Sequence, residues 1–437
     1  MRELEQRFGD VLTVVGVHSG KYVAERDTAR LREAACRLEV AHPVVNDRQL
    51  RTWRAYAVRA WPTLVVIDPE GYVVAQQAGE FTAAAVAPVV EALRDAARER
   101  GTLLPPGTAP LPHVPEAPAR ASGTLRYPGK VAVREEADGT LRVAIADTGH
   151  HRVLVGRARA GALRVEVDHV VGTGTRGLVD AVRAADARLD APQGLCFDGD
   201  TLYVADAGNH AIRAVDLARG GVRTVAGTGQ RLRTRGDLAA GVMASPWDVA
   251  AVAPGRLAVA MAGTHQLWTV EPASRVARPL AGSLAEALHD GSHATAALAQ
   301  PMGLAHGDGA LWFADAESSA IRRADVRPAG DVTTIVGTGL FDFGDRDGAG
   351  DAVRLQHPEG IARHASGRLL VADSYNDALK WVDPPTRTVA TWRRGFHEPT
   401  GVALSTDMAW VADTGAHRVA WIRESTGEEG TVEIELP

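Results

Sequence analysis

One short pattern recurs six times between Tyr127 and Ile422, and it constrains the fold more than any other feature of the chain. Each unit starts with a Pro that leads into an apolar segment, continues to an Ala-Asp pair or a close variant, and ends in a second apolar segment. The units open at Tyr127-Pro128-Gly129, Ala191-Pro192-Gln193-Gly194, Ser245-Pro246-Trp247-Asp248, Gln300-Pro301-Met302-Gly303, His357-Pro358-Glu359-Gly360 and Glu398-Pro399-Thr400-Gly401. A unit that recurs every 40 to 60 residues must stack on its neighbours to bury its faces, so the chain predicts a propeller or a solenoid.

The internal order of each unit distinguishes between these two. The apolar segment after each Pro leads into a strand that ends in the landmark position of the Ala-Asp pair. This position is Asp in five units and Met in the third, at Asp147, Asp206, Met261, Asp315, Asp373 and Asp413. A turn, an alternating run and a further strand follow, and three units end in Gly-Thr-Gly, starting at Gly172, Gly227 and Gly337. Four short strands joined by Gly and Asx turns are typical of a propeller blade, so six units predict six blades.

These residues resemble the NHL repeat, whose blades open on Pro-x-Gly, continue to an Ala-Asp-x-Gly-Asn-His-like turn and close on Gly-Thr-Gly. The resemblance covers roughly the last 300 residues.

The first hundred residues follow a different pattern. Apolar strands are expected at 12–17, 63–67 and 72–75, and helices at 28–38, 47–56 and 82–100. This alternation predicts an α/β domain that ends in a hairpin and a helix.

The order of these elements, with Trp61-Pro62-Thr63 before an apolar strand, resembles the thioredoxin-like fold. In that family a cis proline faces a Cys-x-x-Cys motif and offers backbone groups to a substrate strand. The resemblance therefore predicts a cis Trp61–Pro62 bond and a substrate cleft at Trp61, Pro62 and Thr63.

The family's Cys-x-x-Cys is absent, because Cys36 and Cys196 are the only cysteines. The resemblance implies that the chain starts inside the first helix, at residues 1–8, so that the central strand and the nucleophile would lie upstream. Either the true start lies upstream or the domain has become a packing module, with apolar strand edges left unpaired.

A Pro-rich stretch separates the two parts. We expect an incomplete thioredoxin-like domain at 1–100, a linker at 101–123 and the propeller at 124–437, which makes the fold class α/β plus all-β. Together they resemble the NHL-repeat proteins that carry an N-terminal thioredoxin domain. The final segment, 428–437, alternates like a strand, so it either closes the last blade or starts a truncated C-terminal β segment.

Composition excludes several functions. A net charge of −6 argues against nucleic acid as a partner, and no apolar run approaches the length of about 18 residues that a membrane helix needs. Two cysteines cannot form a Cys-based zinc site. Residues 1–6 carry alternating charge and no apolar stretch, so we expect no export signal there. We expect a cytoplasmic protein without a cofactor.

Two repeated positions are candidate sites. Four units carry His after the turn, at His151, His210, His265 and His417, and such a ring could hold an axial metal, as in some propeller lyases and lactonases. The alternative, which we favour, is that these side chains bind neighbouring strand backbones. The five landmark Asp residues are expected to accept N–H groups of their turns.

The leading interpretation is a binding or scaffold protein for a protein or peptide client, with no catalytic residue and no metal in this chain. Two alternatives stay open. The first is a thiol-disulfide oxidoreductase or peroxidase-like protein with an upstream Cys-x-x-Cys, and the second is a propeller lyase or hydrolase with an axial metal.

Overall fold

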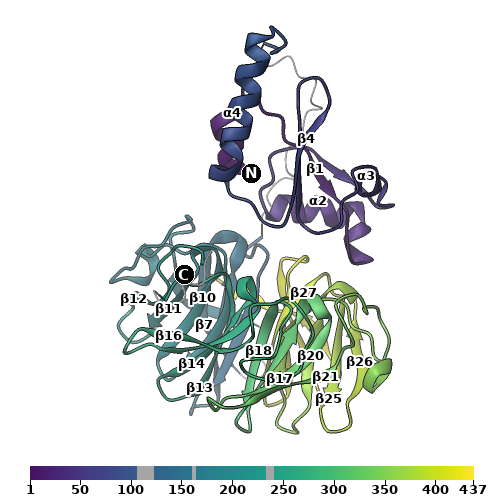
Figure 1. Cartoon of the computed structure of the whole chain (residues 1–437). Coiled ribbons are helices and arrows are strands. Elements are labelled where there is room, and N and C mark those ends of the chain that lie inside the picture. Colours follow the sequence, from purple (N-terminus) through teal and green to yellow (C-terminus); the bar gives the residue numbers. More distant parts are fainter. Residues whose placement is uncertain (106–122, 160–163, 233–240) are drawn as a thin grey trace. The chain divides into compact units, whose positions relative to one another are not determined.

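The computed structural model describes residues 1–105, 123–159, 164–232 and 241–437. The chain forms two compact units, Met1–Arg120 and Ala121–Pro437, which are described separately (Figure 1). Most of the expected linker, residues 106–122, lies outside the described residues. None of the helices in the described ranges is long and apolar enough to cross a membrane.

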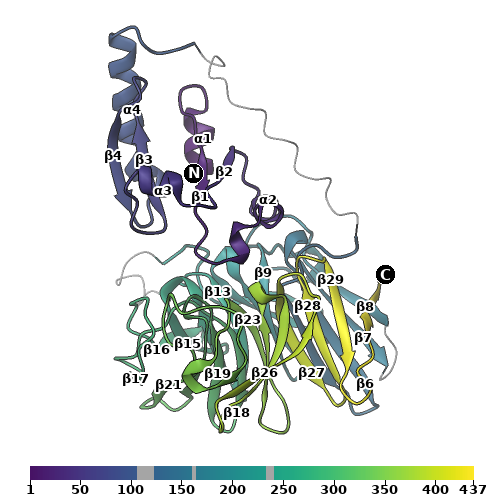
Figure 2. The same cartoon turned by 90° about the vertical axis from the view of Figure 1, so that its right-hand side faces the viewer.

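The second unit is a β-propeller whose described residues form six sheets of four or five strands (Figure 2). The first three blades consist of β5 (Lys130–Glu135), β6 (Thr140–Asp147), β7 (Arg152–Arg159) and β8 (Arg164–Val171); of β9 (Pro192–Asp198), β10 (Thr201–Asp206), β11 (Ala211–Asp216) and β12 (Val222–Ala226); and of β13 (Pro246–Ala253), β14 (Arg256–Met261), β15 (Gln266–Glu271) and β16 (Val276–Ala281).

The last three blades are built in the same way. They consist of β18 (Pro301–Gly307), β19 (Ala310–Asp315), β20 (Ala320–Asp325) and β21 (Asp331–Val336); of β23 (Pro358–Arg363), β24 (Leu369–Asp373), β25 (Ala378–Asp383) and β26 (Thr388–Arg394); and of β27 (Pro399–Ser405), β28 (Met408–Asp413), β29 (Arg418–Arg423) and β30 (Glu429–Thr431). The prediction of six blades is confirmed.

Each blade buries its faces against the next one. The first strand of every blade contacts the first strand of the following blade, and β27 contacts β5, so the ring is closed. Apolar side chains of neighbouring blades form shared clusters; Trp410 and Trp421 of the sixth blade, for example, pack with Val143 and Leu154 of the first. The pairwise stacking expected from the repeat is therefore present.

The C-terminal segment joins the last blade to the first. After β30, the chain forms β31 (Glu433–Glu435), which pairs in parallel with β8 at the outer edge of the first blade. Arg164 of β8 forms ion pairs with Glu433 and Glu435, and Val432 is buried in the cluster between the two blades. In Figure 2 the yellow strands β28 and β29 lie beside the blue strands β7 and β8. The segment thus supplies the fourth strand of the sixth blade and an additional edge strand of the first.

Several blades protect their outer edges. β17 (Gly291–Ser292) pairs with β21, and β22 (Gly348–Ala349) pairs with β26, so the fourth and fifth blades gain a short additional strand. The outer strand of the third blade contains Pro279, which has no N–H to offer to another strand.

The first unit contains α1 (Arg2–Phe8), β1 (Gly16–His18), η1 (Ala24–Arg26), α2 (Thr28–Arg37), β2 (Val44–Asn46), α3 (Arg51–Ala55), β3 (Thr63–Ile67), β4 (Val73–Ala78) and α4 (Ala83–Glu99). Leu4 and Phe8 of α1 pack against Val86 and Val90 of α4. β1 pairs in parallel with β2, and β3 pairs antiparallel with β4.

The strand expected at 12–17 is shorter than predicted, because only Gly16 and Val17 of that range lie in β1. Its one strand neighbour, β2, pairs over three residues, so the remaining apolar residues have no ladder to extend. The two small sheets do not pair with each other within the described part of the unit. Val15, Val17, Val45 and Ile67 are accordingly exposed, which agrees with the expected unpaired strand edges.

A buried ion pair connects blades that are not neighbours in the ring. At the third position of Pro-x-Gly, four blades carry Gly, whereas the first carries Lys130 and the third carries Asp248. At Gly194, Gly303, Gly360 and Gly401 a Cβ atom would lie 2.3–2.7 Å from an atom of another blade, so this position has no room for a side chain there. Lys130 Nζ donates to Asp248 Oδ2, and the two residues are only 9% and 2% exposed.

Removing one partner of this pair should destabilise the propeller. Lys130→Ala or Asp248→Ala leaves an uncompensated buried charge, and we expect each to lower the free energy of unfolding by about 3–5 kcal/mol. The double variant should lose clearly less than the sum of the two single losses. Urea titrations followed by tryptophan fluorescence measure all four proteins, and strictly additive losses would contradict the pairing.

Candidate functional site

The turn after the second strand of each blade ends in a residue with left-handed backbone geometry. The six residues have φ between 50° and 54°, and they are His151, His210, His265, Ser319, Asp377 and His417. This geometry reverses the chain into the third strand and turns each side chain toward the next blade. The four predicted ring histidines are members of this set.

Each of these side chains accepts a hydrogen bond from the backbone N–H of the residue that precedes the next blade's Pro. The donors are Ala191, Ser245 and Gln300 to the Nδ1 atoms of His151, His210 and His265, His357 to Ser319 Oγ, Glu398 to Asp377 Oδ1, and Tyr127 to His417 Nδ1, with distances of 3.0–3.2 Å. The last bond closes the ring between the sixth and first blades. The interpretation as backbone partners therefore describes these residues.

The ring does not form a metal centre. Each histidine uses Nδ1 at a different blade junction, and no three His, Cys, Asp or Glu side chains in the described ranges form a group that could hold a metal ion. The geometry thus gives the axial-metal alternative no support.

At the same junctions, the landmark Asp residues accept the backbone N–H of the residue two positions before the first Pro of their own blade. Their Oδ1 atoms accept from Arg126, Asp190, Ala299, Gln356 and His397, in that order for Asp147, Asp206, Asp315, Asp373 and Asp413, at 2.7–2.8 Å. In the third blade, Met261 Sδ lies 3.3 Å from the N–H of Ala244 and takes the same place. Two consecutive N–H groups before each Pro are therefore satisfied, one by the blade itself and one by the preceding blade.

The second carboxylate oxygen of each Asp faces a cation. Arg213 and Arg322 are fully buried and pair with Asp206 and Asp315 at 2.8 and 2.9 Å. Arg152, Lys380 and Arg418 pair with the other three. Burial raises the pKa of Asp206 to about 6, although Asn209, the Asp190 N–H and Arg213 act in the opposite direction.

The third blade replaces this charged pair with apolar groups. Met261 stands at the Asp position, and the fully buried Trp268 stands where Arg213 and Arg322 stand in their blades, seven residues after the landmark. Well-packed apolar residues can replace a buried ion pair without loss of stability. The absence of Asp from this blade therefore has a structural compensation.

Three loops between blades are fixed by a further Asp, which the sequence analysis did not identify. Asp180, Asp290 and Asp347 accept hydrogen bonds from the backbone N–H and the hydroxyl group of Thr224, Thr334 and Thr391, respectively. In each pair the Thr follows the Asp by 44 residues. The same carboxylates contact Arg213, Arg322 and Lys380. The constant Asp-to-Thr spacing was the available sequence signal.

The acidic loop at 342–348 is neutralised within the protein. Lys380 Nζ lies 2.7 Å from Asp345 and 3.3 Å from both Asp347 and Asp373. Arg394 adds a second cation at 2.7 Å from Asp345. Both cations therefore stabilise carboxylates of this loop.

The cysteines do not form a redox pair. Cys36 is half-buried in the first unit, and Cys196 lies in the propeller, so the two residues belong to different units. Burial raises the pKa of the Cys196 thiol well above its usual range, and this keeps it protonated.

The predicted cleft residues of the first unit lie at the start of β3. The Trp61–Pro62 bond is cis, as expected. Trp61 Nε1 donates to the Ser19 carbonyl at 2.7 Å, and its ring lies 4.4 Å from that of Trp53. Thr63 Oγ1 donates to the Ala60 carbonyl at 2.7 Å.

This segment presents an accessible surface. Trp61 is 48% exposed despite its contacts, and Pro62 is exposed beside it. The Gly79 N–H donates to the Pro62 carbonyl at 2.8 Å, so β4 covers one side of the segment. Within the described residues, the backbone N–H and C=O of Trp61 form no hydrogen bond.

The ring-closing bond should depend on pH. Burial, followed by the charges of Arg126, His397 and His150, lowers the pKa of His417 below its ordinary value of 6.5. The folded state then binds fewer protons than the unfolded state. The contribution of neutral His417 to the free energy of unfolding is therefore complete above pH 6.5 and is lost as pH falls through the pKa of His417 in the folded state. We expect His417→Asn, which keeps an acceptor but cannot titrate, to reduce the loss of unfolding free energy between about pH 7 and pH 5.

Other titrating groups cancel in this comparison, because both proteins contain them. His417→Ala provides the control: it removes the acceptor, so it should cost about 1–2 kcal/mol at neutral pH, measured by urea unfolding. An unchanged pH slope in the Asn variant would contradict the assignment.

Comparison with known proteins identifies the repeat. The sequence model of the NHL repeat matches residues 189–214, which form β9, β10 and most of β11. Protein SUPPRESSOR OF QUENCHING 1, chloroplastic, from Arabidopsis thaliana is 34% identical over 463 residues, with 98% of this chain and 43% of that protein covered. NHL repeat-containing protein 2 from Gallus gallus is 33% identical over 470 residues, with 96% and 63% covered.

The chain thus spans less than two thirds of the length of either relative. Among solved structures, a streptogramin B lyase is 11% identical with a TM-score of 0.46, over 72% of this chain and 86% of that one, which supports no inference about activity. The matched repeat, the relatives that align over nearly the whole chain and the six blades of one design together support an NHL-repeat β-propeller protein.

Proposed function

We propose that this chain is a binding and scaffold protein for a protein or peptide client. In this proposal the first unit is a thioredoxin-like module that receives an extended peptide, and the propeller is a rigid recognition platform. The observation that carries the proposal is the unpaired backbone of Trp61, next to the exposed Trp61 ring and Pro62.

An extended peptide can use these groups directly. A strand that adds to an exposed edge gains main-chain hydrogen bonds, and pockets for alternate side chains supply its specificity. Trp61 offers one N–H and one C=O for such bonds, while the Pro62 carbonyl is already bound to Gly79. Trp is also a frequent anchor at protein interfaces.

The propeller supports the platform role through its rigid loops. Asp180, Asp290 and Asp347 each fix a loop to the outer strand of the following blade. Loops fixed on a rigid scaffold suit recognition, since little conformational entropy is lost on binding.

The proposed client is not a nucleic acid, because the net charge of −6 provides no general attraction to phosphate. The proposal also includes a cytoplasmic location, which fits two cysteines that are unpaired with each other.

Peptide binding to the full chain tests the proposal. The probe is a fluorescein-labelled nonapeptide with alternating Val and Thr and two Glu residues, and the readout is fluorescence anisotropy. Trp61→Ala should weaken binding about 30-fold, as expected for the loss of an aromatic hot spot. Trp61→Ala and its control below both alter exposed side chains, and thermal unfolding should confirm that each variant keeps the fold.

Tyr72→Ala is the matched control, because Tyr72 is a 71% exposed aromatic residue of the same unit. It should bind the peptide like the unmodified chain. Equal losses in the two variants, or disulfide reductase activity of this polypeptide toward insulin, would contradict the proposal; the second result would favour the oxidoreductase alternative.

A further inference from the structure

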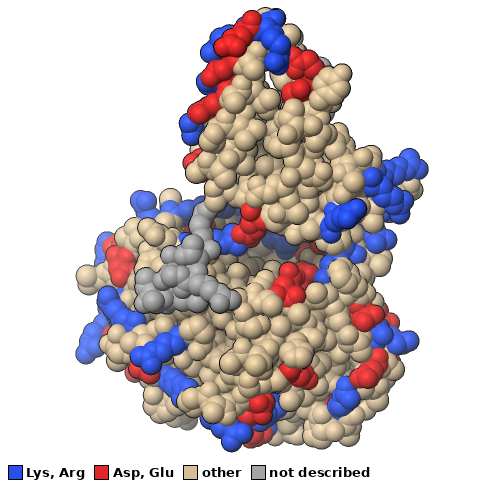
Figure 3. All heavy atoms as spheres, viewed as in Figure 1, with Lys and Arg blue, Asp and Glu red and all other residues tan. Residues whose placement is uncertain are grey.

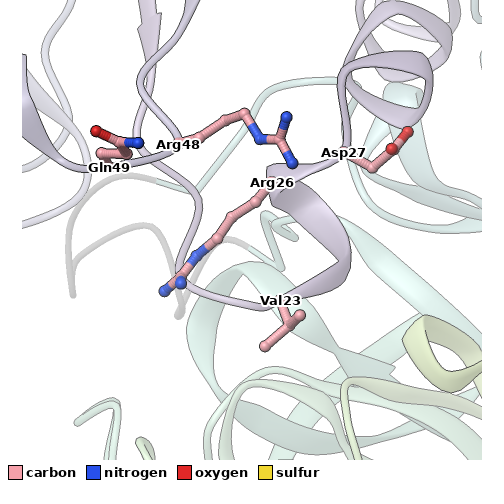
Figure 4. A pocket seen from close by; sticks show the side chains of 5 residues that line it. All are labelled: Val23, Arg26, Asp27, Arg48 and Gln49. Carbon is pink, nitrogen blue, oxygen red and sulfur yellow. The ribbon is translucent and has the colours of Figure 1, made fainter.

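A pocket in the first unit lies between two segments that follow strands β1 and β2. Val23, Arg26, Asp27, Arg48 and Gln49 line it. Figure 4 shows that Arg26 and Arg48 come from different segments, that the guanidinium of Arg48 extends toward Asp27, and that the guanidinium of Arg26 points away from that of Arg48. Positive charge is therefore present at two places in the pocket.

The pocket and the Trp61 segment belong to the same end of the unit. β1 and β2 are parallel, so the segments after His18 and Asn46 leave from one edge of their sheet. The Trp61 indole binds the Ser19 carbonyl, and the Ser19 hydroxyl donates to Asp47, directly before Arg48. The carboxyl ends of parallel strands are where open α/β sheets bind ligands.

Neither pocket arginine forms an ion pair within the described residues, although the charge of Arg48 interacts with that of Asp27 in the same pocket. The buried Nε of Arg26 has no hydrogen-bond acceptor. This differs from the propeller, where Arg213 and Arg322 are each paired with two carboxylates. An unpaired guanidinium beside a binding surface is available for a ligand.

The carboxylates nearby are already engaged. Asp27 Oδ1 accepts the N–H groups of Ala29 and Arg30 at the start of α2. Asp47 is buried and accepts three backbone N–H groups at the start of α3 as well as the Ser19 hydroxyl. These bonds lower the pKa of both carboxyl groups. Figure 3 shows Lys and Arg side chains gathered over α3, so the surroundings of the pocket add positive charge.

We propose that this pocket binds anionic side chains of the peptide whose backbone pairs with Trp61. The inference rests on the proposed function, and it adds the class of client: an extended peptide with acidic residues. Guanidinium groups bind carboxylates and phosphates through two parallel N–H···O bonds, which makes arginine well suited to this task. Glutamate and phosphoserine supply the same charge, and the experiment distinguishes them.

The test uses the full chain and three nonapeptides that differ only at two positions, which carry Glu, Gln or phosphoserine. Wild-type protein should bind the Glu peptide at least about 10-fold more tightly than the Gln peptide, since the pocket arginines then gain partners. Arg26→Gln and Arg48→Gln should each reduce this preference, and the double variant should abolish it. Added salt should also reduce the preference.

Arg54→Gln is the matched control, because Arg54 lies in α3 but does not line the pocket. It should keep the preference for the Glu peptide. An effect of Arg54→Gln equal to that of Arg48→Gln would overturn the pocket and indicate general attraction.

The outcomes separate the two proposals. If the Glu and Gln peptides bind wild-type protein equally and Trp61→Ala weakens both, the pocket inference is wrong and the proposed function stands. If no peptide binds, both fail. Tighter binding of the phosphoserine peptide than of the Glu peptide would assign the pocket to phosphorylated clients, and the reverse order would assign it to unmodified acidic ones.

Discussion

The propeller depends on how each blade satisfies two consecutive backbone N–H groups before its first strand. The first N–H is bound by the landmark Asp of the same blade, and the second by the left-handed residue of the blade before. The Pro that follows has no backbone N–H, so no third acceptor is needed. Because unpaired buried N–H groups are costly, every junction must supply these two acceptors. One dipeptide thereby connects the inside of a blade to its neighbour, and six such connections make a closed ring.

The junctions require an acceptor atom and not a particular residue. The second N–H of a junction is bound by His, Ser or Asp, depending on the blade. The first N–H is bound by an Asp carboxylate in five blades and contacts the Met261 sulfur in the third. This explains how the pattern tolerates substitution without loss of the fold. It also explains why the repeated histidines are distributed among blades: each is placed by its own junction, and the arrangement creates no shared centre in the described residues.

The repeat made the six blades and the histidine acceptors predictable, because these are local features that recur in register. The landmark Asp residues were expected to accept N–H groups of their own turns, whereas their Oδ1 atoms accept the N–H that lies two residues before the first Pro of the blade. The pair of Lys130 and Asp248 was not predictable, since the residues are 118 positions apart and meet only once the ring has formed. The Asp180–Thr224 contact was marked in the sequence by its repeated spacing. The two residues lie in a loop and in a strand, however, and their spacing matches no familiar motif. In the first unit the element order was predictable, but the apolar run at 12–17 suggested a longer strand than three residues of β2 can pair. The Arg26 and Arg48 pocket depends on two segments that only the parallel pairing brings to one edge.

The ion pair of Lys130 and Asp248 also makes the blades non-equivalent. Four inner strands carry Gly at this position and are interchangeable there, whereas the first and third are complementary to each other. In a ring with one blade more or fewer, the inner circle would have a different diameter, and a lysine side chain of fixed length would no longer meet the carboxylate. The geometry of this ion pair therefore fits a ring of six blades. An array with another number of blades would lose this contact and leave two buried charges without their partners.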